Sequence, residues 1–98
     1  MSRTIGIIAG SGIYPEVFIN AARSKSPDTR LVMAAFHGET REEVANKAEQ
    51  ADWFSVGQLG KMIKFFKNHG VNEAIMVGQI APKNLFDLRP DVRTMLLL

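Results

Sequence analysis

Four short apolar runs divide the chain, at residues 4–9, 30–36, 53–56 and 74–77. Within each run nearly every position is apolar, whereas a strand with one face in solvent would alternate apolar and polar residues. Continuous apolar runs of this length are typical of strands that are covered on both faces of a parallel sheet. The pattern therefore predicts four buried parallel strands with helices between them.

Two of the intervening segments carry helix signals at their starts. The first helix is expected from about Pro15, because proline is favoured in the first turn, to about Lys25. The second is expected after Thr40, which forms a capping-box pattern with Glu43. Apolar residues at helical spacing give each helix a face for the core. They are Val17, Phe18, Ala21 and Ala22 in the first helix, and Val44, Ala45 and Ala48 in the second.

The third helix has the clearest pattern. Four apolar residues recur at the spacing i, i+3, i+4 and i+7, while lysines occupy other positions around the helix. The apolar residues are Leu59, Met62, Ile63 and Phe66, and the lysines are Lys61, Lys64 and Lys67. Gly70 follows as the expected residue that ends the helix.

The alternation of strands and helices predicts an α/β fold: an open parallel sheet of about four strands, with helices on both faces. We expect a Rossmann-like strand order of 3-2-1-4. In that order the chain reverses its direction of travel across the sheet between the first and fourth strands. Ligands of such sheets bind beyond the carboxyl ends of the strands at this switch point. The loops after these two strands are therefore the first candidates for a site.

The last apolar stretch predicts a fourth helix, which Pro90 and Asp91 would open, and the sequence ends at Leu98 without a helix cap. The apolar stripe of this helix would comprise Val92, Met95 and Leu96. We expect residues 1–98 to form a single domain that is truncated, with this apolar stripe facing protein that is missing from the sequence. The uncovered apolar residues favour self-association, most simply as a homodimer.

The composition disfavours several classes of protein. With 46% hydrophobic and 22% charged residues, the 98 residues are expected to form one soluble globular domain. No cysteine is present, and His37 and His69 are not at zinc-ligand spacing, so we expect no disulfide and no structural zinc site. The net charge is only +2 and the basic residues are dispersed, which disfavours nucleic acid as a partner. The N-terminal apolar run is too short for a signal peptide or a membrane span, so a cytoplasmic location is expected.

Three glycine loops are predicted at one edge of the sheet. After the first strand, Gly10-Ser11-Gly12-Ile13 opens a helix, and such a turn lets backbone N–H groups approach a phosphate closely. The turn departs from the dinucleotide fingerprint, because Pro15 stands where the third glycine would be. The other two loops, Val56-Gly57-Gln58 and Val77-Gly78-Gln79, follow the third and fourth strands. Each glycine alone is explained by a tight strand exit, but three such loops with two amide side chains suit a polyphosphate or sugar ligand.

The remaining polar and aromatic residues favour structural roles. Lys61 could reach a phosphate from the start of the third helix, whereas the other two lysines of that helix are expected to be solvated. His37 and His69 are interpreted as a loop residue and a helix-capping residue, and Trp53-Phe54 as part of the core. Since no nucleophile with an adjacent base is apparent, no catalytic or metal-ligating residue is assigned.

Three stretches of sequence are more specific together than any one of them is alone. They are Ile8-Ala9-Gly10-Ser11-Gly12-Ile13-Tyr14-Pro15, then Gly57-Gln58-Leu59-Gly60-Lys61, then Val77-Gly78-Gln79-Ile80-Ala81-Pro82 leading into Leu88-Arg89-Pro90-Asp91. Their order and spacing make essentially the whole chain resemble the N-terminal domain of the LpxI-type UDP-2,3-diacylglucosamine pyrophosphatases. One departure is Ala81, which stands where we expect a basic residue before Pro82.

The resemblance implies a hydrolase of lipid A biosynthesis that cleaves the diphosphate of UDP-2,3-diacylglucosamine to UMP and 2,3-diacylglucosamine 1-phosphate. It also implies a magnesium-dependent cytoplasmic enzyme, peripheral to the inner membrane, with its catalytic carboxylate in a C-terminal domain. This chain alone is therefore expected to be inactive and to hold no metal. By position, the implied substrate contacts are Gly10, Ser11, Gly12, Ile13, Gly57, Gln58, Leu59, Gly60, Lys61, Gly78, Gln79 and Ile80.

Two other functional classes stay open: a non-catalytic nucleotide-binding regulatory module, and one half of a dinucleotide-dependent oxidoreductase. The oxidoreductase requires an acidic residue soon after the second strand. Glu39, which follows His37 and Gly38, fits that spacing poorly. The regulatory module is therefore the main alternative.

Overall fold

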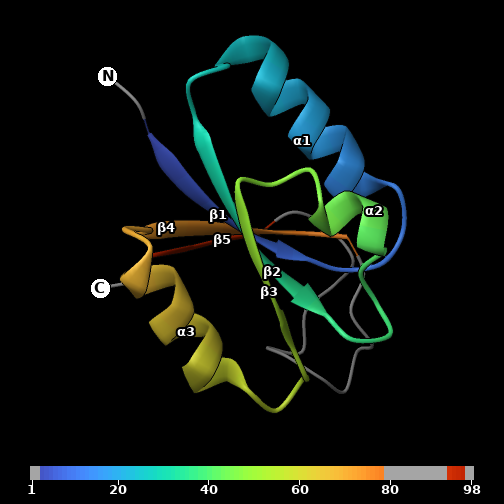
Figure 1. Cartoon of the computed structure of the whole chain (residues 1–98), viewed down its shortest axis with the longest axis vertical. Coiled ribbons are helices and arrows are strands. Elements are labelled where there is room, and N and C mark those ends of the chain that lie inside the picture. The colour runs from blue at the N-terminus through green and yellow to red at the C-terminus, as the bar shows by residue number, and fades with distance from the viewer. Residues whose placement is uncertain (1–2, 79–92, 97–98) are drawn as a thin grey trace.

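The computed structural model describes residues 3–78 and 93–96 of the chain. These residues form one five-stranded sheet in the order β3-β2-β1-β4-β5, with three helices around it (Figure 1). The elements are β1 (Thr4–Ala9), α1 (Tyr14–Lys25), β2 (Arg30–Phe36), α2 (Glu42–Ala45), β3 (Gln50–Phe54), α3 (Leu59–Asn68), β4 (Glu73–Val77) and β5 (Arg93–Leu96).

The first four strands are parallel and lie in the predicted order 3-2-1-4. Helices α1 and α2 cover one face of the sheet and α3 covers the other (Figure 1). The prediction of an open α/β sheet with helices on both faces is thereby confirmed. The switch point consequently lies between β1 and β4, where residues 6–9 pair with residues 74–77.

Two hydrophobic layers hold the helices on the sheet, and neighbouring residues of β1 belong to different layers. Ile7 lies in the same cluster as Ile19 of α1 and Val44 of α2, whereas Ile8 lies with Phe66 of α3. Both isoleucines are fully buried. The continuous apolar runs in the sequence thus reflect strands that are covered from both sides.

The predicted third helix is confirmed, including its end. His69 occupies the C-cap position, and the N–H of Gly70 donates to Lys67 O over 3.2 Å. The N–H of Val71 donates to Phe66 O over 2.9 Å, which completes a Schellman motif. Val71 and Phe66 also belong to one core cluster, so the motif joins the helix end to the core.

The prediction for the core face of α1 was wrong in part. Val17 and Ala21 are exposed, while Phe18 and Ala22 pack against the core as expected. The face that meets the sheet consists of Pro15, Phe18, Ile19 and Ala22. These positions follow the i, i+3, i+4, i+7 spacing more closely than the predicted set, because they centre the stripe on Ile19.

The third strand begins and ends earlier than predicted, at Gln50–Phe54 instead of 53–56. It is an edge strand, so its exposed positions tolerate polar residues such as Gln50 and Asp52. The Asp52 carboxylate accepts a hydrogen bond from the Trp53 N–H over 2.9 Å. An apolar run was therefore the wrong signal for this strand, because exposed and half-buried residues alternate along most of its length.

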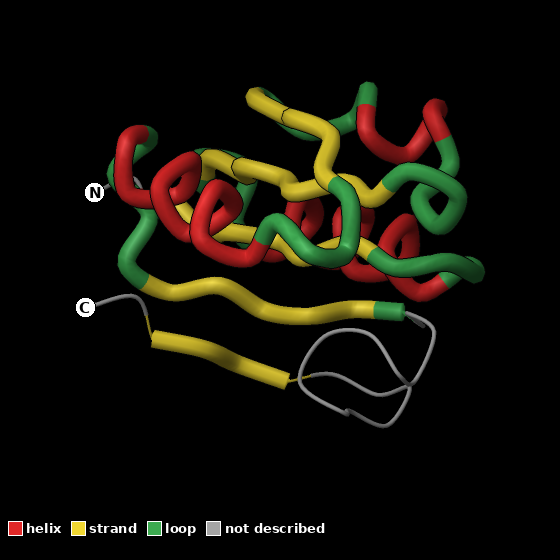
Figure 2. Tube along the Cα trace, turned by 90° about the horizontal axis from the view of Figure 1, so that it is seen from below, coloured by secondary structure: helices red, strands yellow, loops and turns green. Residues whose placement is uncertain are grey.

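The predicted fourth helix is also wrong over the residues that the structure describes. Arg93–Leu96 form β5, which pairs antiparallel with β4, so that residue 93 lies opposite Met76 and residue 96 opposite Glu73 (Figure 2). Pro90, Asp91 and Val92 lie outside the described residues. The edge of β4 offers backbone hydrogen-bond partners, and this tertiary context overrides a helical pattern that rests on very few residues. None of the helices in residues 3–78 has the length and apolar character to cross a membrane.

Candidate functional site

The glycine turn after β1 lies directly against the end of β4. The Gly10 N–H donates to Val77 O over 2.8 Å, which ties the two strand exits together. Gly78 is buried and has a φ of 100°, and a Cβ at this position would lie 2.7 Å from the backbone oxygen of Ser11. The two loops predicted at the switch point therefore meet, and they meet closely enough to require glycine at position 78.

The outer part of the turn is open. Gly12 is exposed, its φ is 91°, and no heavy atom lies within 4 Å of where its Cβ would be. Ile13 is the N-cap residue of α1 and gives it no side-chain hydrogen bond. Ile13 and Tyr14, which begin the helix, are about 60% exposed. A helix start with this geometry presents backbone N–H groups and the positive end of the helix dipole to solvent.

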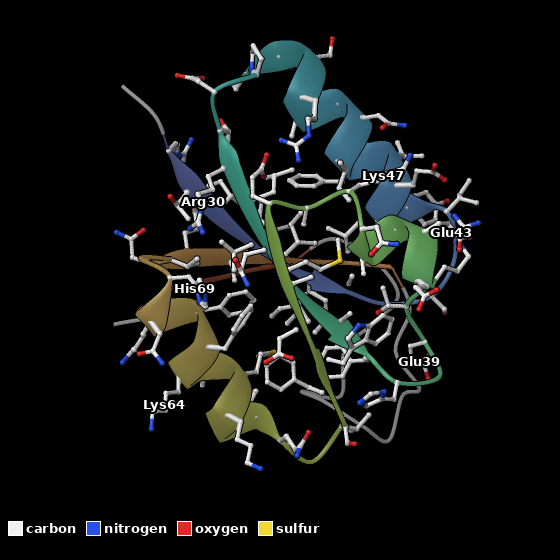
Figure 3. The ribbon with its side chains drawn as sticks, in the orientation of Figure 1. Arg30, Glu39, Glu43, Lys47, Lys64 and His69 are labelled. Atoms are coloured by element: carbon white, nitrogen blue, oxygen red, sulfur yellow. The ribbon has the colours of Figure 1, made fainter. Side chains whose placement is uncertain are left out.

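A carboxylate in the first turn of α1 is neutralised by two cations. Glu16 accepts from Lys47 Nζ over 2.7 Å and from Arg41 over 3.1 Å. Lys47 first, and then Arg41, hold the pKa of the Glu16 carboxyl below its usual range. Figure 3 shows Lys47 beside α1. Because these cations offset its charge, Glu16 opposes an anion at the amino end of α1 less than a free carboxylate would.

Thr40 holds the exit of β2 to the end of β1. Its hydroxyl accepts from the Phe36 N–H over 2.8 Å and donates to Ala9 O over 2.6 Å. The predicted capping box with Glu43 is therefore wrong, since α2 begins after Arg41 and has no side-chain cap hydrogen bond. A threonine that is 8% exposed forms stronger contacts with the sheet than with a one-turn helix. Ala9 immediately precedes the glycine turn, so Thr40 helps to fix the start of that turn.

Two aromatic rings stack near the carboxyl ends of the strands, as the glycine turn does. His37, on the turn after β2, and Trp53, near the end of β3, have ring centroids 5.6 Å apart and an interplanar angle of 25°. His37 is exposed and Trp53 is half-buried. The loop role predicted for His37 is confirmed, but its ring partner was not predicted. The signal was present in the predicted strand order, which places the exit of the second strand beside the third.

The loop after β3 is farther from the turn than the loop after β4. The exit of β2 separates it from the glycine turn, as the strand order and Figure 1 show. The Gln58 side-chain oxygen accepts from the Ser55 N–H over 2.7 Å, so this amide closes its own loop. Leu59 packs against the core, and Gly57, Gly60 and Lys61 are exposed. Gln79 and Ile80 lie outside the described residues.

The other histidine, His69, lies near the amino ends of the strands, opposite the glycine turn. His69 Nδ1 lies 2.9 Å from Phe65 O, and the His69 carbonyl accepts from Arg30 over 3.3 Å (Figure 3). His69 thus caps α3, as predicted. Within residues 3–78 and 93–96, no group of three or more His, Cys, Asp or Glu residues is arranged to hold a metal ion.

Comparison with protein families shows that the model of the LpxI N-terminal domain matches residues 4–98. The match covers all eight strands and helices of the structure. No curated protein and no solved structure gives a significant match.

Proposed function

This chain belongs to the LpxI N-terminal domain family, and LpxI is an enzyme of lipid A biosynthesis. We propose that the chain is the substrate-binding domain of a UDP-2,3-diacylglucosamine pyrophosphatase. In this proposal the parent enzyme hydrolyses the diphosphate to UMP and 2,3-diacylglucosamine 1-phosphate. The domain holds the nucleotide part of the substrate, and a C-terminal domain supplies the catalytic carboxylate. The protein acts in the cytoplasm, as a homodimer in peripheral contact with the inner membrane that carries its diacylated substrate.

The open glycine turn at the switch point carries the proposal. Gly10 and Gly78 lock the exits of β1 and β4 together, while Gly12 and the amino end of α1 face solvent. A diphosphate needs backbone N–H donors that it can approach without obstruction, and this turn offers them in a fixed arrangement. Glu16 opposes an anion there only weakly, because Lys47 and Arg41 offset the charge of its carboxylate. The exposed residues Gly12 and Ile13 are therefore the proposed diphosphate contacts, and Gly10, Ser11 and Gly78 hold them in place.

Magnesium belongs to the proposed reaction, but the described residues do not fit a magnesium site. Residues 3–78 and 93–96 bring together no group of three or more His, Cys, Asp or Glu residues that could hold a metal ion. The proposed chemistry of these residues is therefore limited to binding and orienting the substrate. We assign the metal to the parent enzyme's C-terminal domain, and we propose that this domain alone is inactive.

The substitution Gly12→Val tests the proposed site. Valine at a φ of 91° is strained and must shift the turn, and its branched side chain would stand over the N–H groups that a phosphate approaches. Loss of one hydrogen bond to a charged group weakens binding about tenfold to a hundredfold. We expect a loss of this size in the affinity of the full-length enzyme for UDP, measured by calorimetry.

Gly70→Val is the matched control for this experiment. Gly70 also has a positive φ, of 76°, and open space around it, but it ends α3 at the opposite edge of the sheet. The control should lose stability and keep its affinity for UDP. If Gly12→Val folds and binds UDP as tightly as the unmodified enzyme, the turn has only a structural role. If UDP binds but UDP-2,3-diacylglucosamine is not hydrolysed, the chain is instead part of a nucleotide-binding regulatory protein.

A further inference from the structure

The stacked rings of His37 and Trp53 lie within reach of the glycine turn. Adjacent strands are about 4.8 Å apart, and the order β3-β2-β1 places His37 one strand and Trp53 two strands from that turn. Thr40 fixes this arrangement, because its hydroxyl bonds to Ala9 at the end of β1 and to Phe36 at the end of β2. His37 is the next residue after Phe36. The rings therefore hold a defined position beside the proposed diphosphate contacts.

The outer face of His37 is suited to stack against a flat ring. Trp53 covers one face of the imidazole at a shallow angle of 25°, and His37 remains exposed. Gly38, which follows it, is also exposed and has no heavy atom within 4 Å of where a Cβ would be. A ring that is already held in one orientation by its neighbour loses little conformational entropy when a ligand stacks on it.

The charges around this surface favour the base end of a nucleotide over its phosphate end. Glu39 lies on the same turn as His37, at the exit of β2 (Figure 3). Its carboxylate repels phosphate groups. The glycine turn next to it offers backbone N–H donors and the positive end of the α1 dipole. A nucleoside diphosphate that spans the two places would therefore place its diphosphate on the glycine turn and its base on the rings.

We propose that His37, supported by Trp53, is the surface on which the uracil ring of the nucleotide stacks. This inference rests on the proposed function and adds to it the part of the site that recognises a base. Stacking requires only a flat π-face and no hydrogen bonds to the base edge. The surface therefore provides affinity for a pyrimidine nucleotide and contributes little to discrimination between uracil and cytosine.

The test compares two ligands and three variants in the full-length protein. His37→Ala should weaken the binding of UMP about tenfold, since stacking on one aromatic side chain has an effect of this order. It should leave the binding of inorganic pyrophosphate unchanged. His37→Phe, which restores a flat ring, should bind UMP as the unmodified protein does. His69→Ala removes the other histidine, at the opposite edge of the sheet, and should change neither affinity.

The outcomes separate this inference from the proposed function. If the unmodified protein binds neither UMP nor pyrophosphate, the proposed function fails and the inference fails with it. If UMP binds and His37→Ala leaves its affinity unchanged, the stacking surface is refuted while the proposed function stands. The inference is also refuted if His37→Phe is as weak as His37→Ala. A parallel loss of pyrophosphate binding in His37→Ala would refute it too, because the side chain would then act through the position of the glycine turn.

Discussion

Gly78→Ala is expected to destabilise the domain by about 3 kcal/mol, since two separate costs combine. A side chain at a φ of 100° is strained in itself. The new methyl group would also lie 2.7 Å from Ser11 O, 3.1 Å from the Gly10 carbonyl carbon and 3.2 Å from the Pro15 ring. Two of these neighbours are backbone atoms, so they cannot move aside by changing a rotamer. The substitution must push the exits of β1 and β4 apart.

Gly57→Ala provides a control at the same edge of the sheet. Gly57 has open space around it and a backbone conformation outside the left-handed region. Alanine at such a position usually stabilises a protein by about 0.4–1 kcal/mol, because it restricts the unfolded chain. Urea denaturation of both variants should therefore give free energies of unfolding that change in opposite directions. A loss of less than about 1 kcal/mol in Gly78→Ala would show that the two loops do not pack as described.

Thr40→Val is expected to cost about 2–3 kcal/mol of unfolding free energy. Valine has nearly the shape of threonine but can neither donate nor accept a hydrogen bond. The substitution would leave the Phe36 N–H and the Ala9 carbonyl without their hydroxyl partner, in a position where the side chain is 8% exposed. Buried backbone groups that lose their partners bear the full cost of desolvation.

Thr40→Ser keeps the hydroxyl and provides the matched control. It should retain most of the stability, and the difference between the two variants isolates the hydrogen bonds from the packing of the methyl group. Denaturation by urea, followed by circular dichroism, measures both. UDP affinity should follow the same order, because Ala9 precedes the glycine turn. Equal destabilisation by serine and valine would mean that the methyl group, and not the hydroxyl, holds the exits of β1 and β2 together.

The sequence was sufficient to predict those elements whose local pattern and tertiary environment agree. The bounds of β1 and β2 agree with the predicted runs 4–9 and 30–36, because both strands are covered on two faces. The predicted end of α3 at Gly70 also agrees with the structure. Prediction failed at the edges of the sheet: β3 alternates where an apolar run was sought, and Arg93–Leu96 pair with β4 although their spacing suggested a helix. Edge strands depend on their neighbours for their conformation, and a local pattern does not contain those neighbours.

The candidate site was predictable as a location but not as a set of contacts. The strand order alone placed Gly10 and Gly78 at one switch point. The bond of Thr40 to the sheet could not be predicted in the same way, because a threonine four residues after a strand fits a helix cap equally well. The stacking of His37 on Trp53 likewise depends on the register of β2 and β3, which pairs Ala35 with Trp53. The packed sheet sets the register, so no single residue in the sequence predicts it.

The central place of β1 also determines how this domain folds. Its partners are β2, which follows after one helix, and β4, where Ile7 lies opposite Ile75. The unit from β1 to β2 has mainly local contacts and can form early, whereas the pairing of β1 with β4 must close a loop of most of the chain. On the ribosome, β1 would therefore keep one edge unpaired until residue 77 has left the exit tunnel. We expect this unpaired edge of β1 to make the nascent chain a target for chaperones, because an unpaired apolar strand can pair with other chains.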